Sequence, residues 1–153
     1  MKTAKDLYKS PDMNWDYSPI LNNVEGEIVL HIKDNDYQGD SFVLYKKDDK
    51  YGYLTFGWGS CSGCDALQAC STYEDIQELM DTLYNSIQWF DDYESFKNYM
   101  ADTSIQELKF SWHSRSFHEF RKLIIEENYD VDKLLYGDYA TEDFLDGYWE
   151  ENT

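Results

Sequence analysis

Two cysteines, Cys61 and Cys64, have the spacing in this chain that most directly indicates chemistry. They lie in the stretch FGWGSCSGCDAL, residues 56–67, a loop rich in glycine and serine between an expected strand and an expected helix. A C-x-x-C loop occurs in thiol–disulfide sites and contributes half of many zinc sites. The same residues can also form a tight structural turn. The elements around the loop have to discriminate among these readings.

A thioredoxin-like redox site is disfavoured by the rest of the chain. In such a site the helix that follows the motif lowers the pKa of the first thiol, and a βαβ unit precedes the motif. Hairpin strands precede the loop here instead. The site also needs a later proline to shape it, and the last proline of this chain is Pro19.

Zinc binding is the second interpretation. Structural zinc takes four nitrogen or sulfur ligands, usually as two close pairs. Cys61 and Cys64 supply one pair, and Cys70 with His113 or His118 would have to complete the set. The sequence has no second CxxC and no HxxxH, so a zinc site on Cys61, Cys64, Cys70 and His113 rests on half of a signature.

An anion-binding loop is the third interpretation, and a structural turn is the fourth. Glycines in the loop allow backbone N–H groups to turn toward a ligand at a helix start. The loop has no lysine or arginine, however, and Asp65 stands where an anion would bind. We favour the structural turn, in which no cofactor is needed, and keep zinc as the alternative.

The run F-G-x-G-S-C-S-G-C-D resembles a motif of small, uncharacterised acidic proteins of bacteriophages. In those proteins a β-meander leads into S-C-S-x-C-D and then into a helix. The resemblance covers about residues 50–70 of this chain. It implies a phage or prophage setting and carries no assigned chemistry with it.

The overall charge excludes several kinds of partner. The chain has 31 Asp and Glu residues against 13 Lys and Arg, which gives a net charge of −18. Phosphate groups of nucleic acids and of anionic membranes would be repelled by it, so we expect neither direct nucleic-acid binding nor membrane binding. The charge either serves solubility or imitates a phosphate backbone, in which case it would occupy a nucleic-acid-binding surface of another protein.

Much of this charge lies in residues 126–153, an acidic and aromatic-rich C-terminal segment. It contains ten acids against Lys133 alone, a balance of nine negative charges. Rings between acids can anchor an interface while the carboxylates meet a basic rim, although they can also pack on the protein's own core. The predicted partner-binding residues are Asp138, Glu142, Asp143, Asp146, Tyr148, Trp149, Glu150 and Glu151.

The pattern of apolar residues predicts one α+β domain. After an irregular arm over residues 1–25, alternating residues predict a three-stranded antiparallel meander near 27–33, 40–47 and 51–57, and a fourth strand near 106–112. We expect helices to pack on one side of this small sheet.

Three helices are expected before the C-terminal segment from the apolar spacing of three and four residues, and residues 131–153 are expected to form one or two further short helices, the second capped by Thr141. The longest spans about 72–90 and opens with a capping box of Ser71 and Glu74. A shorter one spans about 92–102, and a third runs to about 127 from a capping box of Ser116 and Glu119.

Function is predicted from the charge and from the motifs that are missing. The sequence contains no GxSxG and no HExxH motif, no apolar run of the roughly 20 residues that span a bilayer, and no secretory signal. We therefore expect a non-enzymatic, phage-encoded inhibitor in the host cytoplasm, whose acidic surface binds a basic nucleic-acid-binding surface of a host protein. The alternative is a small zinc-binding or thiol-dependent enzyme centred on the CSGC loop.

Overall fold

The computed structural model describes residues 1–33, 39–59, 65–102 and 114–127, except for the side chains of residues 114–116. The predicted strand near 106–112 and most of the acidic C-terminal segment therefore lie outside the described residues.

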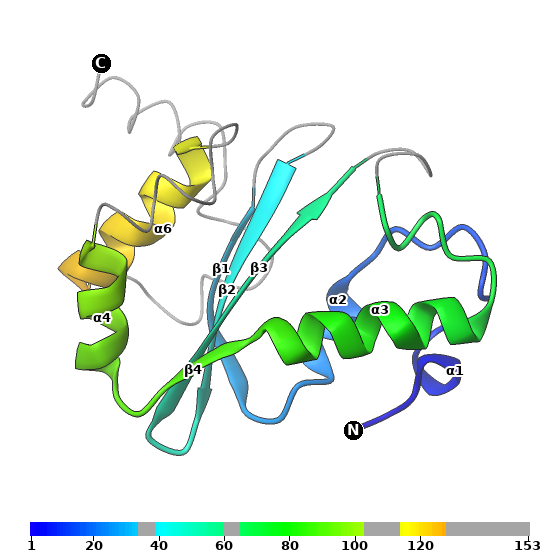
Figure 1. Ribbon diagram of the computed structural model, residues 1–153, viewed down its shortest axis with the longest axis horizontal. Coiled ribbons are helices and arrows are strands. Elements are labelled where there is room, and N and C mark those ends of the chain that lie inside the picture. Colours follow the sequence, from blue (N-terminus) through cyan, green and yellow to red (C-terminus); the bar gives the residue numbers. More distant parts are fainter. Residues whose placement is uncertain (34–38, 60–64, 103–113, 128–153) are drawn as a thin grey trace.

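A four-stranded antiparallel sheet is the centre of the described structure. Its strands are β1 (Glu27–Lys33), β2 (Gly39–Lys47), β3 (Lys50–Trp58) and β4 (Gln88–Phe90), and they lie side by side in the order β1-β2-β3-β4. Each neighbouring pair is antiparallel. The predictions of an α+β fold and of a three-stranded meander are confirmed (Figure 1).

The middle strand of the meander is central, as its apolar residues on both faces predict. Residues Ser41 to Tyr45 of β2 are all buried. A two-residue turn joins β2 to β3, with Lys47 opposite Lys50. Asp48 in this turn has a φ of 54°, a left-handed conformation that aspartate tolerates better than most residues.

A β-bulge in β1 changes which side chains share a face. The register with β2 shifts between Ile28 and Leu30, because Val29 is an extra residue. Simple alternation along β1 predicts that Ile28, Leu30 and Ile32 share one face. For Ile28 this prediction is wrong, because Ile28 packs with one apolar cluster, whereas Leu30 and Ile32 belong to the other. Beyond the bulge the alternation is regular, so His31 lies opposite Val43.

The long helix α3 (Tyr73–Ser86) is shorter than the pattern predicts, and its cap lies one residue later. Thr72 is the N-cap, and its side chain accepts a hydrogen bond from the backbone N–H of Asp75. The predicted box of Ser71 and Glu74 is therefore wrong. After Ser86 the chain becomes extended, and residues 88–90 pair with β3 as β4.

Two further helices lie close to the predicted ranges. The helix α4 (Tyr93–Ala101) has Asp92 as its N-cap, and Phe96 and Met100 face the core. The helix α6 (Ser114–Glu126) ends as expected but begins earlier, since Ser116 is already helical. The predicted capping box at Ser116 is wrong for that reason.

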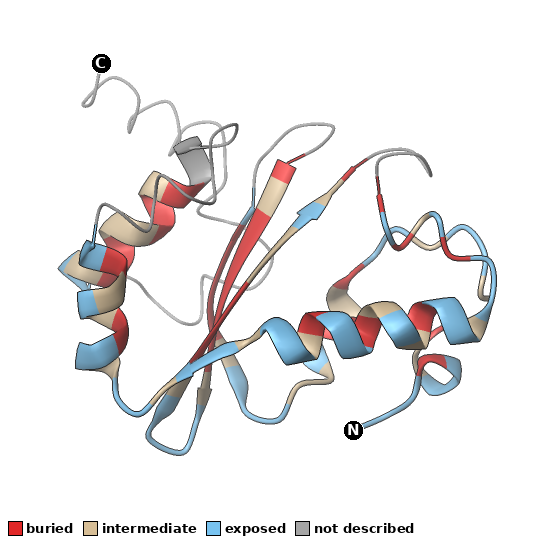
Figure 2. Cartoon of the chain, viewed as in Figure 1, coloured by how far each residue is buried: buried red, intermediate tan, exposed pale blue. Residues whose placement is uncertain are grey.

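The helices cover both faces of the sheet, so the expectation that they pack on one side is wrong. Phe42 and Leu44 of β2 pack with side chains of α4 and α6, whereas Val43 and Tyr45 pack with side chains of α3 and the N-terminal segment. Figure 1 shows α4 and α6 on one side of the strands and α3 on the other, and Figure 2 shows the buried residues of each helix facing inward.

The N-terminal segment is more ordered than the irregular arm that was predicted. It contains two short helices, α1 (Ala4–Leu7) and α2 (Ser18–Asn22). Ile20 and Leu21 are buried, and the phenol of Tyr45 donates a hydrogen bond to the carbonyl of Leu21 at 2.9 Å. This segment thus forms part of the core on the α3 side.

Candidate functional site

Most of the predicted site residues lie outside the described residues. This holds for the eight predicted partner-binding residues between Asp138 and Glu151, and for Cys61, Cys64 and His113 of the predicted zinc set. Only Cys70 of that set is described. The partner-binding and zinc predictions therefore stay predictions.

Cys70 has the surroundings of a small core residue. It is buried among apolar side chains that include Leu67 and Ile76. Its thiol donates a hydrogen bond to the carbonyl of Ala66 at 3.3 Å, and burial raises its pKa. A raised pKa disfavours the thiolate that binds metal. Among the described residues, no three His, Cys, Asp or Glu side chains are grouped so that they could hold a metal ion.

The two flanks of the CSGC loop are joined by Asp65. One carboxylate oxygen of Asp65 accepts a hydrogen bond from the backbone N–H of Gly59 at 2.8 Å. The other oxygen accepts from the N–H groups of Leu67 and Gln68, at 2.9 and 3.0 Å. Asp65 thus binds backbone N–H groups as an external anion would, which agrees with the expectation that it stands in an anion's place.

The phenol of Tyr17 completes this arrangement, which we name the Asp65 cluster: Asp65 with Gly59, Leu67, Gln68 and Tyr17. The Tyr17 hydroxyl donates to Asp65 at 3.0 Å. Burial, reinforced by the nearby Asp65 carboxylate, raises the pKa of Tyr17. The phenol therefore keeps its proton and remains a donor. Through this bond the N-terminal segment is tied to the chain that follows the loop.

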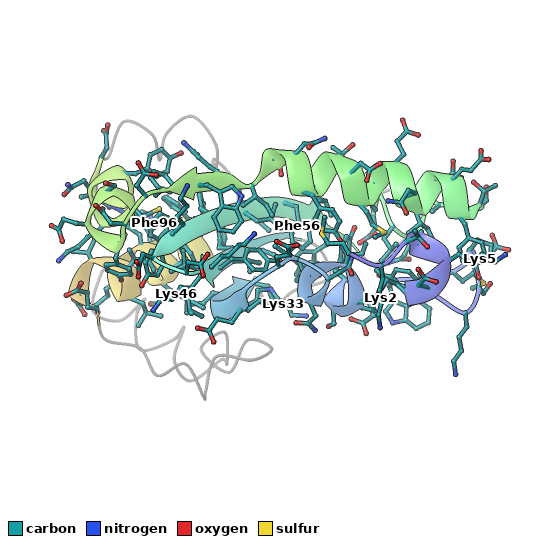
Figure 3. All side chains as sticks on the ribbon, turned by 90° about the horizontal axis from the view of Figure 1, so that it is seen from below. Lys2, Lys5, Lys33, Lys46, Phe56 and Phe96 are labelled. Carbon is teal, nitrogen blue, oxygen red and sulfur yellow. The ribbon has the colours of Figure 1, made fainter. Side chains whose placement is uncertain are left out.

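Beside the Asp65 cluster lies a cavity of about 110 Å³, which we name the His31 cavity. The sheet supplies His31, Ser41 and Trp58 to its wall, and the N-terminal segment covers it with Trp15 and Tyr17. Lys33 places its ammonium group over the Trp58 ring, 5.5 Å from the ring centre. Figure 3 shows Lys33 and Phe56, both of which line the cavity, in the central part of the molecule.

The His31 side chain is only 8% exposed, and its Nε2 atom has no hydrogen-bond partner among the described residues. Burial, with a smaller contribution from the Lys33 charge, lowers the pKa of His31 from 6.5 to about 4. The imidazole is therefore neutral at pH 7. Since Nε2 has no partner, no Ser41–His31 bond of the kind that activates a serine nucleophile is made through that atom.

No sequence motif assigns a role to His31, Ser41 or Trp58. One feature of the sequence does point to His31. It stands in an apolar strand, two residues before Lys33, on a face that should be buried. That Trp58 and Ser41 line the same cavity as His31 could not be predicted from the sequence, because it depends on the register of three strands.

A larger and shallower cavity of about 520 Å³ lies at the opposite end of the strands. It is lined by residues such as Val24, Lys47 and Trp89. Two of its charged groups engage each other, since the ammonium group of Lys47 is hydrogen-bonded to Glu25. We give the His31 cavity more weight because two of the residues that line it, His31 and Trp58, each have a buried nitrogen with no hydrogen-bond partner among the described residues.

The third surface feature is the acidity of α3. Its four acids, Glu74, Asp75, Glu78 and Asp81, are all exposed, and the helix has no lysine or arginine. Hydrogen bonds, the largest from the backbone of Ser71, lower the pKa of Asp75. Three more exposed acids, Asp91, Asp92 and Glu94, follow between α3 and the first turn of α4.

These features define an α+β protein with a meander sheet, an acidic helical surface and one small polar cavity. No protein-family model, curated protein or solved structure matches the chain. Among the described residues, no helix combines the length and the apolar character that crossing a membrane requires.

Proposed function

We propose that this protein is a phage-encoded, non-enzymatic inhibitor that acts in the host cytoplasm. Its acidic surface would occupy the nucleic-acid-binding surface of a host defence protein or nucleic-acid enzyme. The observation that supports this proposal is the unbalanced charge of α3, which has four exposed acids and no base in 14 residues. A surface that served only solubility would not need to exclude lysine and arginine from a whole helix.

The spacing of these acids defines what they can imitate. Glu74, Glu78 and Asp81 are four and three residues apart, and neighbours at such spacings share one face of a helix. With a rise of about 1.5 Å per residue, the carboxylates follow one another every ~4.5–6 Å along the axis. One DNA strand carries a phosphate every ~3.4 Å. The α3 stripe is therefore sparser than a nucleic-acid strand, and the proposed interface includes the acids of the C-terminal segment as well.

The test is capture of host proteins by the immobilised protein at two salt concentrations. Raising salt from about 0.1 M to about 1 M shortens the screening length from ~10 Å to ~3 Å. We expect a basic, nucleic-acid-binding host protein to be retained at low salt and released at high salt. Adding the free protein should then displace labelled duplex from the purified partner in a mobility-shift assay.

Two variants separate the surfaces. The first replaces Asp138, Glu142, Asp143 and Asp146 with Asn or Gln, and the second carries Glu74→Gln, Glu78→Gln and Asp81→Asn. Each should weaken capture, whereas a matched control with Asp12→Asn, Asp48→Asn and Asp49→Asn, three exposed acids that belong to neither set, should not. If none of the variants changes capture, or no basic partner is retained, the proposal is wrong.

A separate experiment tests the zinc-binding alternative. Elemental analysis that finds about one zinc per chain, lost in Cys61→Ser, would favour the metal site over the structural turn. A thiol-dependent enzyme would additionally need an activity that the same variant removes.

A further inference from the structure

Large exposed apolar side chains occur at two places in the described part of the chain. Four such side chains are exposed there: Met1, Met13, Trp15 and Trp89. Met13 and Trp15 belong to residues 9–16, a loop between α1 and α2 that we name the Trp15 loop. Met1 and Trp89 line the cavity of about 520 Å³, which we name the Trp89 cavity. One place is thus a loop that presents its side chains to solvent, and the other is a hollow.

Hydrogen bonds fix the conformation of the Trp15 loop. The phenol of Tyr8 donates to the carbonyl of Asp16 at 2.7 Å, which ties the two ends of the loop together. The side-chain amide of Asn14 donates to the carbonyl of Ser10, also at 2.7 Å. Trp15 is nevertheless 67% exposed. An apolar anchor that is already held in place loses little conformational entropy when it binds.

The Trp89 cavity has an apolar wall and a suitable size. The apolar part of the wall consists of Met1, Val24, Tyr84, Ile87 and Trp89. Trp89 packs on Gly52 of β3, where a Cβ atom would come within 2.9 Å of the Trp89 ring. The ring is thus supported by the sheet and is still 41% exposed. Pockets of about 300–1,000 Å³ accommodate drug-sized molecules, so about 520 Å³ has room for an indole ring.

The Trp15 loop lies far from the Trp89 cavity of its own chain. Trp15 lines the His31 cavity together with Ser41, near the start of β2, whereas Lys47 of the Trp89 cavity ends that strand. The six residues from Ser41 to Lys47 correspond to about 20 Å of strand. A Trp15 side chain that enters a Trp89 cavity must therefore come from another molecule.

The charges of the two surfaces are complementary. The cavity wall has two lysines and two acids, a balance of zero, in a protein whose net charge is −18. In the loop, Asp12 and Asp16 flank the apolar pair. Lys50 of the cavity wall has a side chain that is 64% exposed, 3.9 Å from Asp91, so an incoming loop can bring one of its acids to this lysine. On the acidic face of α3, by contrast, two copies would repel each other.

We propose that the protein associates with a second copy of itself, with the Trp15 loop of one molecule in the Trp89 cavity of the next. Trp15 packs on the Trp89 ring, and Lys50 pairs with an acid of the loop. Because two different surfaces meet, the contact is heterologous and can repeat from molecule to molecule. The inference does not depend on the proposed inhibitor function, since no acid of α3 lines the cavity or belongs to the loop.

Sedimentation equilibrium of the unaltered protein tests the association. The average mass is measured from micromolar to millimolar protein in about 0.3 M NaCl, where the screening length is shorter than the ~10 Å at 0.1 M. We expect the average mass to rise with concentration above that of one chain. The rise should be smaller at low salt, because the net charge of each copy repels the other.

Two tryptophan variants test whether different surfaces meet. Trp15→Ala removes the anchor and keeps the cavity, whereas Trp89→Ala alters the cavity and keeps the loop. Each variant alone should remain monomeric over the same concentration range. An equimolar mixture should form dimers and nothing larger, because one intact loop then meets one intact cavity.

Lys50→Glu is the second cavity variant, and it serves if Trp89→Ala does not fold. Lys50 is on the surface, and reversing its charge should weaken association at least about threefold. The matched control is Lys5→Glu, an exposed lysine of α1 outside both surfaces. It makes the same change in net charge and should weaken association less.

Several results would overturn the proposal. The first is an average mass that stays at one chain up to millimolar concentration. The second is association that persists in Trp15→Ala, and the third is a mixture of the two tryptophan variants that stays monomeric. If Trp89→Ala does not fold, equal association of Lys50→Glu and Lys5→Glu decides against the proposal. None of these outcomes depends on the capture of a host protein, so the two proposals fail separately.

Discussion

At the scale of single residues, Asp65 is the hydrogen-bond acceptor that joins the described flanks of the CSGC loop. It is only 4% exposed and accepts hydrogen bonds from three backbone N–H groups and the Tyr17 phenol. Asparagine in its place would have one acceptor oxygen, and its NH₂ group would face a donor. We expect Asp65→Asn to lower the free energy of unfolding by about 3 kcal/mol, because buried donors lose a charged acceptor.

Urea denaturation measures this loss. Asp49→Asn is the matched control, since Asp49 is exposed in the turn between β2 and β3, and its effect should stay within about 0.5 kcal/mol. A loss below about 1 kcal/mol in Asp65→Asn would mean that water replaces the carboxylate at little cost.

His31 makes stability depend on pH in a defined window. Its pKa is about 4 in the folded protein, against 6.5 for an ordinary histidine, chiefly because it is buried. Between these values the unfolded chain binds a proton that the folded protein does not, so stability falls as pH decreases through this range. The charged groups that share the cavity wall are Lys33, Asp16 and Asp65. We expect His31 to account for a loss of about 2 kcal/mol between pH 7 and pH 5.

The measurement is urea denaturation of the protein and of His31→Gln at both pH values. The variant should lose about 2 kcal/mol less than the unaltered protein over the same interval. His118→Gln is the comparison, because burial and Arg121 also lower the pKa of His118 and give it a separate share of the same loss. An imidazole resonance of His31 that titrates near pH 6.5 would contradict the prediction.

At the scale of elements, the start of α3 depends on one side chain. The hydroxyl oxygen of Thr72 accepts the N–H of Asp75 at 3.1 Å, and the carboxylate of Asp75 accepts the N–H of Thr72 at 3.2 Å. Such N-caps stabilise a helix by about 1 kcal/mol. We expect Thr72→Ala to lower the free energy of unfolding by that amount.

Thr82 provides the control for this substitution. It is exposed in the middle of α3, where alanine has the better helix propensity by up to about 0.7 kcal/mol. Thr82→Ala should therefore be neutral or slightly stabilising in the same denaturation experiment. Equal losses in the two variants would mean that the cap contributes nothing beyond the loss of a threonine.

The elements also show which parts of the fold a local sequence pattern can predict. The hairpin strands and α4 could be predicted because their periodicity and turn residues are local. The end of α3 could not, since Ile87 and Phe90 continue the helical spacing while the edge of β3 recruits residues 88–90 into the sheet. The division of helices between the two faces was missed for the same kind of reason: alternation in β2 makes both faces apolar without saying which helix covers which.

The His31 cavity was beyond sequence reasoning on similar grounds. The histidine itself was visible on a strand, but the bulge at Val29 sets the face on which it lies. Trp58 and Ser41 join it only through the pairing of β2 with β3. Only part of the Asp65 cluster could be predicted. The position of Asp65 directly after the glycine-rich loop is evident in the sequence, but its hydrogen bond to Tyr17 joins residues 48 positions apart.

At the scale of the whole molecule, the net charge of −18 opposes the compact state, because folding brings like charges together. Attraction does little to offset this in the described part of the chain. Ion pairs there join Lys47 to Glu25, Lys50 to Asp91 and Lys97 to Glu127, all on or near the surface. Exposed pairs of this kind contribute about 0–1 kcal/mol each.

We therefore expect salt to stabilise the protein. Raising NaCl from about 0.01 M to about 0.3 M at pH 7 should raise the melting temperature by a few degrees, roughly the effect of 1 kcal/mol, since screening weakens repulsion more than it weakens the exposed pairs. Differential scanning calorimetry at constant pH measures the shift. A protein held together by its ion pairs would respond in the opposite direction.

The acids of α3 allow this prediction to be assigned to a surface. The variant with Glu74→Gln, Glu78→Gln and Asp81→Asn removes three negative charges from one helix face, so it should melt higher than the unaltered protein at low salt and gain less from added NaCl. A charge-conserving variant with Glu74→Asp, Glu78→Asp and Asp81→Glu should keep the full salt response. If neutralisation leaves the salt response unchanged, the repulsion lies elsewhere in the molecule. The acidic face of α3 would then lower the free energy of unfolding only slightly. Its lack of lysine and arginine would not by itself indicate selection for a partner.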